Sequence, residues 1–399
     1  MKIGIVVDNE LNNDIRVLRE IGILKEQGFE IYVICFGFVP TYKDPVEQIH
    51  ITRINIPKKV KDILFFMLNT IPLYEWFWAA KIKRFIIHNK VDSLHVHDLY
   101  MSRAAHNGIR MTKLKISLIL DLHENYPYTV RTYNWTKGFL RRLISRPDEW
   151  EKKEREYLSY ADRIIVLSND FRDVLLIKYH ELEEDRFVVL PNVPDLSQPE
   201  YQNKGIANNP FKNGFPIIFY YGVIAERRGI FDALRVFIDL IKEGHFVNFL
   251  LIGPVDKKDK TLFTELTGLE MLAGLIHYIT WIDSKEFPRF LGICDICIAP
   301  FHKNPQHESG VANKIYDYML GGKPVIASNC KPQQLLIEKH NCGLIFNNTE
   351  EFHDAIVKLL DDKQLREEMG ENGRKAIMKE YNTEIIKENL ISLYNELYL

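Results

Sequence analysis

The chain has 399 residues, of which 46% are hydrophobic and 27% charged, and its formal net charge at pH 7 is −2. This length exceeds one typical core and indicates two or three domains, and the composition is that of a globular protein. A charge balance so close to neutral gives no indication of a nucleic-acid partner.

The five cysteines are odd in number and scattered, which favours a reducing compartment and buried free thiols. Cys294 and Cys297 have the spacing of a metal or redox pair, but no second pair stands at metal-site spacing, so we favour packing. The apolar run 3–7 is too short for a signal peptide and predicts a first core strand. We therefore expect a cytoplasmic protein.

The first half of the chain alternates strands and helices. Residues 3–7 predict a buried strand, 14–25 an amphipathic helix and 31–36 a second strand, which is the unit of a parallel, doubly wound sheet. The turn at 8–13 contains no glycine, so it is not a dinucleotide fingerprint. Further strands are predicted at 93–96, 116–121 and 163–168.

Polar residues follow two of these strands, where ligands of such sheets bind. They are His97 and Asp98 after one strand, and the run 121–124 after the next. His123 can serve as a base or hydrogen-bond donor near pH 7. The alternative for His123 is a satisfied structural histidine.

The second half repeats the α/β pattern. Leu190–Pro194 ends the first domain, and a polar run leads to a strand at 217–221. A helix from about 230 and strands at 246–252, 276–279, 293–299 and 325–327 follow, and the chain is helical in pattern from 350. The predicted organisation is a domain at 1–193, a linker at 194–214, a second domain at 215–375 and a C-terminal helix at 376–399 that packs back across both domains.

The stretch 308–328 predicts a loop, a helix, a glycine turn and a buried strand. Lys314 in the first helical turn would reinforce the attraction of a helix N-terminus for anions, and Asp317 can accept hydrogen bonds from a sugar or ribose hydroxyl. The turn from Gly222 to Gly229 lies on the matching edge, so Arg228 and Lys314 could clamp a diphosphate. The alternative is an ordinary surface helix with a mixed polar face.

Several segments in this order resemble the GT-B glycosyltransferases, specifically the retaining enzymes of family 4. Residues 13–20 resemble the family's D-x-R-V helix, 95–98 its H-x-H-D segment and 121–124 its D-x-H-E segment. The remaining matches are 161–168, 190–192, the turn 222–229 and the N-K-x-Y-D-Y segment with its glycine turn at 313–324. Each motif is weak, but the ordered series covers nearly the whole chain.

The resemblance implies a GT-B fold of two Rossmann-like domains that face a central cleft, with the acceptor held by the first domain and the nucleotide by the second. It implies retaining transfer of a hexose-type sugar from a UDP- or GDP-sugar to a lipid-linked or polysaccharide acceptor in bacterial surface glycan synthesis. No metal and no cofactor are expected, because basic side chains and helix N-termini stabilise the departing diphosphate.

The resemblance also implies roles for individual residues. Arg228 and Lys314, with Gly222 in the adjoining turn, would bind the diphosphate, Asp317 the ribose and Glu308 the donor sugar. His123 would lie beside the transferred sugar, and Asp98, Glu124 and Arg16 are expected on the acceptor side. In the family's usual E-x7-E pattern Ser309 occupies the first position and Asp317 the second, so Glu308 is one place early. The usual Arg directly after the first glycine of the turn is Val223. A sugar-nucleotide epimerase and a non-catalytic GT-B partner are the alternatives.

Two segments of the first domain combine aromatic and basic residues, at 63–84 and 131–146. Such residues suit an anionic membrane interface, whereas the apolar runs are too short to span a bilayer. We therefore expect peripheral contact with the inner face of the membrane. The alternatives are a buried core helix for the first segment and a solvated basic helix for the second.

Overall fold

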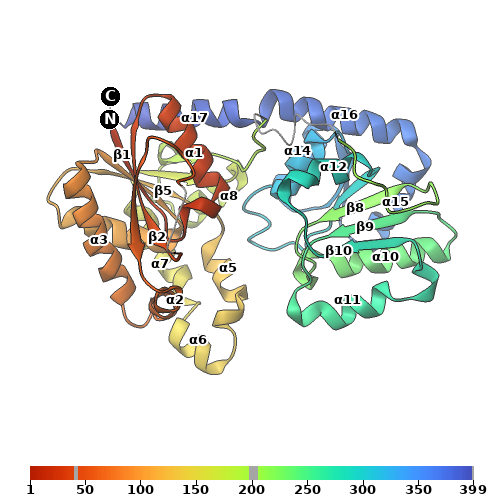
Figure 1. Ribbon diagram of the computed structural model, residues 1–399, viewed down its shortest axis with the longest axis horizontal. Helices are drawn as coiled ribbons and strands as arrows, with labels where there is room; N and C mark the ends of the chain where they lie inside the picture. Colours follow the sequence, from red (N-terminus) through yellow and green to blue (C-terminus); the bar gives the residue numbers. More distant parts are fainter. Residues whose placement is uncertain (40–43, 197–204, 398–399) are drawn as a thin grey trace. The chain divides into compact units, whose positions relative to one another are not determined.

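The computed structural model describes residues 1–39, 44–196 and 205–397, which form two compact units (Figure 1). Unit 1 comprises Met1–Pro191 with Ile386–Leu399, and unit 2 comprises Asn192–Ile385. Residues 197–204 of the predicted linker lie outside the described residues.

Unit 1 contains one parallel sheet of seven strands in the order β3-β2-β1-β4-β5-β6-β7. The central strands are apolar because helices cover both faces, and Figure 1 shows α3 on one side of the sheet and α1 on the other. The strands are β1 (Lys2–Val6), β2 (Glu30–Gly37), β3 (His50–Asn55), β4 (Ser93–His97), β5 (Ser117–Asp121), β6 (Arg163–Val166) and β7 (Phe187–Val189).

Among the described residues of unit 1, eight helices precede the C-terminal segment and connect these strands or extend from them. They are α1 (Ile15–Glu26), α2 (Lys58–Phe66), α3 (Leu73–Asn89), α4 (Ser102–Arg110), α5 (Tyr126–Thr132), α6 (Phe139–Ser145), α7 (Glu149–Ser159) and α8 (Asn169–Lys178). The core contains fully buried Tyr74 and Trp78 of α3 with Trp150 and Tyr157 of α7. For much of α3, which lies in the segment 63–84, the alternative of a buried core helix therefore holds.

Strands β3 and β7 are not among the predicted strands. Both lie at edges of the sheet, and β3 alternates exposed and partly buried residues, with only Ile54 buried. Their pattern is weak because an edge strand of this kind has one partner strand and one open side.

Unit 2 contains a parallel sheet of six strands in the order β10-β9-β8-β11-β12-β13. The strands are β8 (Ile217–Tyr221), β9 (Asn248–Ile252), β10 (Ile276–Ile279), β11 (Ile296–Ala299), β12 (Val325–Ser328) and β13 (Gly343–Phe346). Figure 1 shows α10 and α11 on one side of this sheet and α14 on the other. The helices are α10 (Ile230–Lys242), α11 (Lys260–Thr267), α12 (Phe287–Gly292), α13 (Asn313–Leu320), α14 (Lys331–His340), α15 (Thr349–Asp361) and α16 (Lys363–Glu380).

The last helix, α17 (Thr383–Glu396), returns the chain to unit 1, to which its residues from Ile386 belong. Its residues Ile386, Leu390, Leu393 and Tyr394 are buried. The Tyr394 hydroxyl lies 2.9 Å from Nδ1 of His95 in β4, so the C-terminal segment contributes to the interior of unit 1.

All five cysteines are buried and free, as predicted. Burial raises the pKa of the Cys297 thiol and of the Cys294 thiol, so both stay protonated and serve packing.

Gly229 fixes the start of α10. Its φ is +68°, and a Cβ atom there would lie 1.6 Å from the Pro300 carbonyl oxygen, which follows β11. Gly244, beyond the other end of α10, also has a positive φ of +90°, but nothing lies within 4 Å of its Cβ position. A substitution at Gly244 therefore tests the backbone strain alone, whereas a substitution at Gly229 adds a steric clash to it.

We expect Gly229→Ala to lower the free energy of unfolding by more than about 3 kcal/mol, because the backbone strain adds to a clash with main-chain atoms. Gly244→Ala should cost about 1 kcal/mol from the backbone conformation alone. Urea denaturation of both variants and the wild type measures this. Equal losses in the two variants would contradict the close approach to Pro300.

Candidate functional site

A turn after β8 brings Gly222 to the carboxyl edge of the unit 2 sheet. The chain then runs through a short 3-10 turn, Glu226–Arg228, into α10. Gly222 has a φ of +134°, and a Cβ atom there would lie 2.8 Å from Nζ of Lys314. Glycine is favoured at this position because the positive φ strains any other residue and because a side chain there would displace the Lys314 ammonium.

Two aromatic rings hold the ammonium of Lys314 in the first turn of α13. Its Nζ lies 3.8 Å from the ring centroid of Tyr220 and 5.1 Å from that of Phe301, at distances that suit cation–π attraction. One turn later, the Tyr318 hydroxyl accepts the backbone N–H of Tyr221 over 3.0 Å. This bond fixes α13 against the end of β8, so the position of Lys314 is determined by the sheet.

Arg228 lies on the same aromatic ring, with its guanidinium carbon 5.3 Å from the centroid of Phe301. Its Nη1 is 3.5 Å from Nε2 of His307. Nδ1 of His307 lies 2.7 Å from the His302 carbonyl oxygen, which assigns the proton to Nδ1 and leaves Nε2 as an acceptor toward Arg228. Burial lowers the pKa of His307 to about 4, so the ring is neutral at pH 7 and adds no third charge.

No carboxylate forms an ion pair with Arg228 or Lys314 in the described part of the chain. Burial lowers the pKa of Arg228, and burial together with Arg228 holds the pKa of Lys314 well below its usual range. No side chain caps the first turn of α10 or of α13. Two cations without counter-charges beside two uncapped helix starts have the chemistry that suits a polyanion such as a diphosphate.

Asp317 and Glu308, the other predicted donor contacts, lie on either side of the start of α13. Asp317 is partly buried one turn after Lys314, and burial together with its charge raises the pKa of Tyr221. Glu308 accepts the backbone N–H of Lys331 over 2.9 Å, at the start of α14. Ser309 is 1% exposed and donates to the Gln306 carbonyl oxygen. Glu308 therefore contributes to helix capping, and its contact with a donor sugar stays a prediction.

In unit 1, the predicted residue Arg16 is buried against Asp121 at the end of β5. Its Nε and Nη2 donate to the two carboxylate oxygens over 2.9 and 3.0 Å, and its Nη1 donates to the Leu190 carbonyl oxygen over 3.0 Å. Arg16 is only 8% exposed, so the structure places it behind the site surface, and a direct acceptor contact stays a prediction. Although burial alone would raise it, Arg16 and His123 hold the pKa of Asp121 well below its usual range.

His123 completes this network at the surface, with 22% of its side chain exposed. Its Nε2 lies 3.3 Å from Oδ2 of Asp121 and 3.0 Å from Nδ1 of His97. Burial disfavours the imidazolium, but the Asp121 carboxylate outweighs it and raises the pKa of His123 to about 9. With Nε2 engaged, Nδ1 is the atom that can meet a ligand, and near pH 7 it carries a proton to donate.

Asp98 lies beside this network after β4, in an unusual backbone conformation. Its φ is +73°, which costs a non-glycine residue about 1–3 kcal/mol and is most frequent at functional sites. Its backbone N–H donates to the Asp121 carbonyl oxygen over 2.9 Å, and the Tyr100 hydroxyl donates to its carboxylate over 3.1 Å. Neighbouring groups thus hold the strained conformation in place.

Glu124 is partly buried and accepts the Tyr133 hydroxyl over 2.9 Å. Burial raises the pKa of Glu124 to about 7, and its charge adds to the burial that raises the pKa of Tyr126. The Tyr126 hydroxyl is buried and has no hydrogen-bond partner among the residues that the structure describes.

Several residues of these two sites were not predicted. They are Tyr220, Phe301 and His307 in unit 2, and Tyr126 and Asp8 in unit 1. Asp8 ends the β1 segment, is 4% exposed, and accepts hydrogen bonds from Trp78 Nε1 over 3.0 Å and from the Tyr74 hydroxyl. Lys61 Nζ lies 3.2 Å from it. A polar residue directly after a buried strand was the available signal for Asp8, as it was for Asp98.

One cluster of described residues has the spacing of a metal site: Glu20, His95, His97 and Asp121, whose ligand atoms lie within 4.8 Å of one another. Arg16 already contacts both carboxylates of this cluster, over 2.9 Å to Asp121 and 3.2 Å to Glu20. The guanidinium supplies the positive charge that a cation would bring, so we interpret the cluster as an ion-pair network.

The fold is that of the GT-B enzymes, with two Rossmann-like units that carry the candidate site residues at the carboxyl edges of their sheets. Residues 16–198 match the model of glycosyltransferase family 4, and residues 202–376 match that of the glycosyl transferases group 1. The chain belongs to family 4 of the glycosyltransferases. Both matched models describe transferases, which favours a transferase over the epimerase alternative.

Individual relatives are distant. The chain is 25% identical over 187 residues to the capsular polysaccharide biosynthesis glycosyltransferase CapM of Staphylococcus aureus, which covers 45% of this chain and 46% of that protein. It is 24% identical over 362 residues to an uncharacterized glycosyltransferase of Methanocaldococcus jannaschii, with 86% and 93% covered. The chain spans about half the length of the first curated relatives it matches.

Among solved structures, sucrose-phosphate synthase of Thermosynechococcus elongatus superposes with a TM-score of 0.74 at 16% identity, over 100% of this chain and 99% of that one. At this identity the likeness establishes the fold.

The raised pKa of His123 predicts how stability changes with pH. The imidazolium is favoured by folding, so its contribution is complete below pH 6.5 and is lost as pH rises through about 9. Glu124, whose pKa burial raises from 4.5 to about 7, lowers the stability as pH rises between these two values, so most of its effect lies at lower pH than that of His123. We expect Asp121→Asn to lower the pKa of His123 to below its usual value, because burial and the charge of Arg16 then outweigh the Asp98 carboxylate. Ring-nitrogen NMR, with His123→Gln for assignment, measures this, and an unchanged pKa would contradict the role of Asp121.

Proposed function

We propose that the protein is a retaining hexosyltransferase that takes a sugar from a UDP- or GDP-sugar and passes it to a glycan or lipid-linked acceptor in bacterial surface polysaccharide assembly. The observation that carries this proposal is the pair Arg228 and Lys314, whose charges no carboxylate balances among the described residues. A nucleotide diphosphate supplies the missing negative charge.

In this proposal unit 2 binds the donor. Arg228 and Lys314 contact the diphosphate and stabilise the charge that develops as the bond to the sugar breaks, without metal. Because both cations are held in place before the donor arrives, little reorganisation is needed at the moment of reaction. Asp317 accepts hydrogen bonds from the ribose, as the resemblance to the family implies.

Unit 1 supplies the acceptor side. His123 is an imidazolium near pH 7, which suits hydrogen-bond donation to the transferred sugar better than proton abstraction. Asp98 and Glu124 are proposed to accept hydrogen bonds from acceptor hydroxyls. Similarity to a capsular polysaccharide glycosyltransferase supports a surface glycan as the acceptor.

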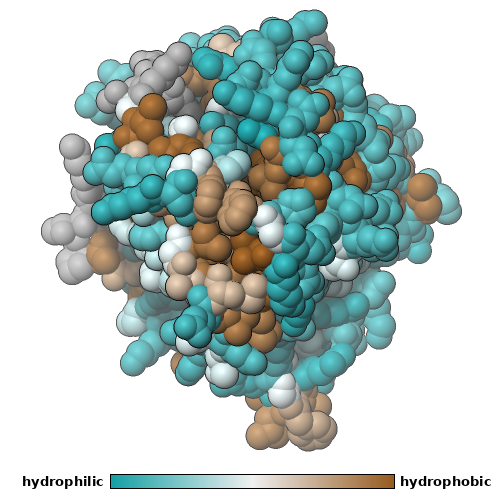
Figure 2. All heavy atoms as spheres, turned by 90° about the vertical axis from the view of Figure 1, so that its right-hand side faces the viewer, coloured by the Kyte–Doolittle hydropathy of each residue, from teal (hydrophilic) through white to brown (hydrophobic). Residues whose placement is uncertain are grey.

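Helix α6 presents an apolar surface that supports membrane contact. Phe139, Leu140 and Leu143 are 84%, 70% and 59% exposed. Figure 2 shows an apolar protrusion at the lower end of the molecule, where Figure 1 has α6. Side chains of Asn69 and Thr70 donate to carbonyl groups at the end of α6, so the loop between α2 and α3 supports this surface. No helix within the described ranges is long and apolar enough to cross a bilayer.

The basic residues around α6 are partly neutralised. Arg131 pairs with Glu151 and Asp148, and Arg142 pairs with Asp148. In the segment 63–84, Ile63 and Trp76 are exposed by 59% and 61%. We therefore propose that insertion of apolar side chains contributes more to membrane contact than electrostatic attraction does.

Donor binding tests the proposal directly. We expect one nucleotide of a UDP and GDP series, with the corresponding sugar nucleotides, to bind the wild type in calorimetry. Arg228→Gln and Lys314→Met should each weaken this binding by about 10- to 100-fold, as loss of a charge-assisted hydrogen bond does. Arg227→Gln is the matched control, because Arg227 is exposed and pairs with Asp256.

Unligated Lys314→Met should be at least as stable as the wild type, since it removes a desolvated charge next to a like charge. Loss of binding with retained stability separates a donor contact from a folding defect. Unchanged donor affinity in Lys314→Met would show that the proposed clamp is wrong.

Membrane contact is tested by flotation with vesicles of phosphatidylcholine, with and without phosphatidylglycerol. We expect the wild type to float with the anionic vesicles and Phe139→Ser/Leu140→Ser to lose most of this binding. Ile177→Ser on α8, another exposed apolar residue at 72%, is the control and should float like the wild type. Flotation of the double variant at the wild-type level would exclude α6 as the contact.

A further inference from the structure

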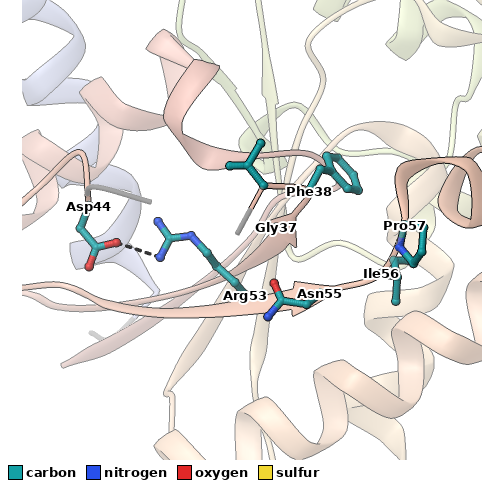
Figure 3. Close-up of a pocket in the computed structure, with 8 residues that line it drawn as sticks. Gly37, Phe38, Asp44, Arg53, Asn55, Ile56 and Pro57 are labelled. Atoms are coloured by element: carbon teal, nitrogen blue, oxygen red, sulfur yellow. Dashed lines mark ion pairs between the residues drawn. The ribbon is translucent and has the colours of Figure 1, made fainter. Parts of the chain in front are cut away.

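A pocket of about 720 Å³ opens at the carboxyl ends of β2 and β3 in unit 1 (Figure 3). Its volume is in the range of pockets that hold small molecules. Figure 3 shows Arg53 and Asn55 side by side on β3, with Asp44 facing Arg53 and the ring of Phe38 above them. The lining residues are Gly37, Phe38, Val39, Asp44, Arg53, Asn55, Ile56 and Pro57.

The walls of this pocket are fixed by neighbouring groups. Arg53 Nη1 lies 2.8 Å from the Asp44 carboxylate, and Nη2 lies 3.4 Å from Oδ1 of Asn12. The backbone N–H of Phe38 donates to the Glu10 carboxylate over 3.0 Å, and its ring stacks on Phe36 at 5.5 Å. Both Glu10 and Asn12 belong to the connection after β1, so the pocket is tied to the centre of the sheet.

The chemistry of the lining favours an uncharged ligand with many hydroxyl groups. The charges of Arg53 and Asp44 cancel, so an anion would have to approach a carboxylate or displace it. The Asn55 side-chain amide has no hydrogen-bond partner in the described part of unit 1 and offers both donors and an acceptor. An aromatic ring beside such groups can pack against the apolar face of a sugar. A sugar unit meets all three features.

The pocket and His123 lie at the same edge of one sheet. The strand order places β2 and β3 on one side of β1, and β4 and β5 on the other. At about 4.8 Å between neighbouring strands, the pocket is about 17 Å from the end of β5. A ligand that reaches both positions must extend over several sugar units.

We propose that this pocket is a second acceptor subsite, which binds an uncharged sugar unit of the acceptor glycan several units away from the hydroxyl that reacts. The inference rests on the proposed function, because it takes the acceptor to be a glycan bound by unit 1. It adds that the acceptor is an oligosaccharide rather than a single sugar, and that its distal part carries no charge where it meets Arg53.

The test uses the full chain on a glycan array with neutral mono- to hexasaccharides and the same chains carrying phosphate or carboxylate. We expect retention to rise with the length of the neutral chains. Phe38→Ala and Asn55→Ala should each reduce binding of the long chains at least about fivefold, as loss of one hydrogen bond or ring contact does. Thr52→Ala, on the same strand but the opposite face, is the control and should bind like the wild type.

Nucleotide binding and donor hydrolysis are measured in parallel and should be unchanged in all three variants. Equal retention by wild type and Asn55→Ala, retention of charged chains alone, or no retention of any neutral chain would each overturn the subsite. If neutral chains bind through Asn55 while no nucleotide sugar binds, the subsite stands and the proposed donor chemistry fails.

Discussion

The site in unit 2 depends on keeping two positive charges close together without a counter-charge. Burial of a cation is costly, and a neighbouring cation adds to that cost, as the lowered pKa of Lys314 records. Aromatic rings offset part of this cost, with Phe301 near both cations and Tyr220 near Lys314. The glycine at 222 follows from the same constraint, because any side chain there would displace the ammonium.

The charges in unit 1 are arranged in the opposite way. Its buried charges are balanced: Asp121 accepts two hydrogen bonds from Arg16 and lies within reach of His97 and His123. A balanced network is rigid, and it fixes one histidine nitrogen while the other remains available. Unit 2 therefore holds an incomplete charge arrangement that a ligand completes, and unit 1 holds a complete one that orients a side chain toward a ligand.

The sequence predicted the parts of the structure that local patterns determine. Apolar runs predicted the central strands, and helical spacing with the glycines predicted α13 and the turn before α10. The partner of Arg16 could not be predicted, because Asp121 lies 105 positions away and meets it only through the order of the strands. The motif position of Glu308 predicted a contact with the donor sugar. The hydrogen bond that its carboxylate accepts from the backbone N–H of Lys331 could not be predicted, because it depends on the path of a loop.

Two of the residues that were missed, Phe301 and His307, share one physical reason. Phe301 and His307 act on cations of other segments, and neither carries a charge, so composition and charge pattern do not mark them. Phe301 packs beside both cations and His307 contacts Arg228, so both residues help to set where Arg228 and Lys314 lie. Motif positions can identify the charged members of such a site. The uncharged neighbours that contact these charges can be identified only once the order of the strands is known.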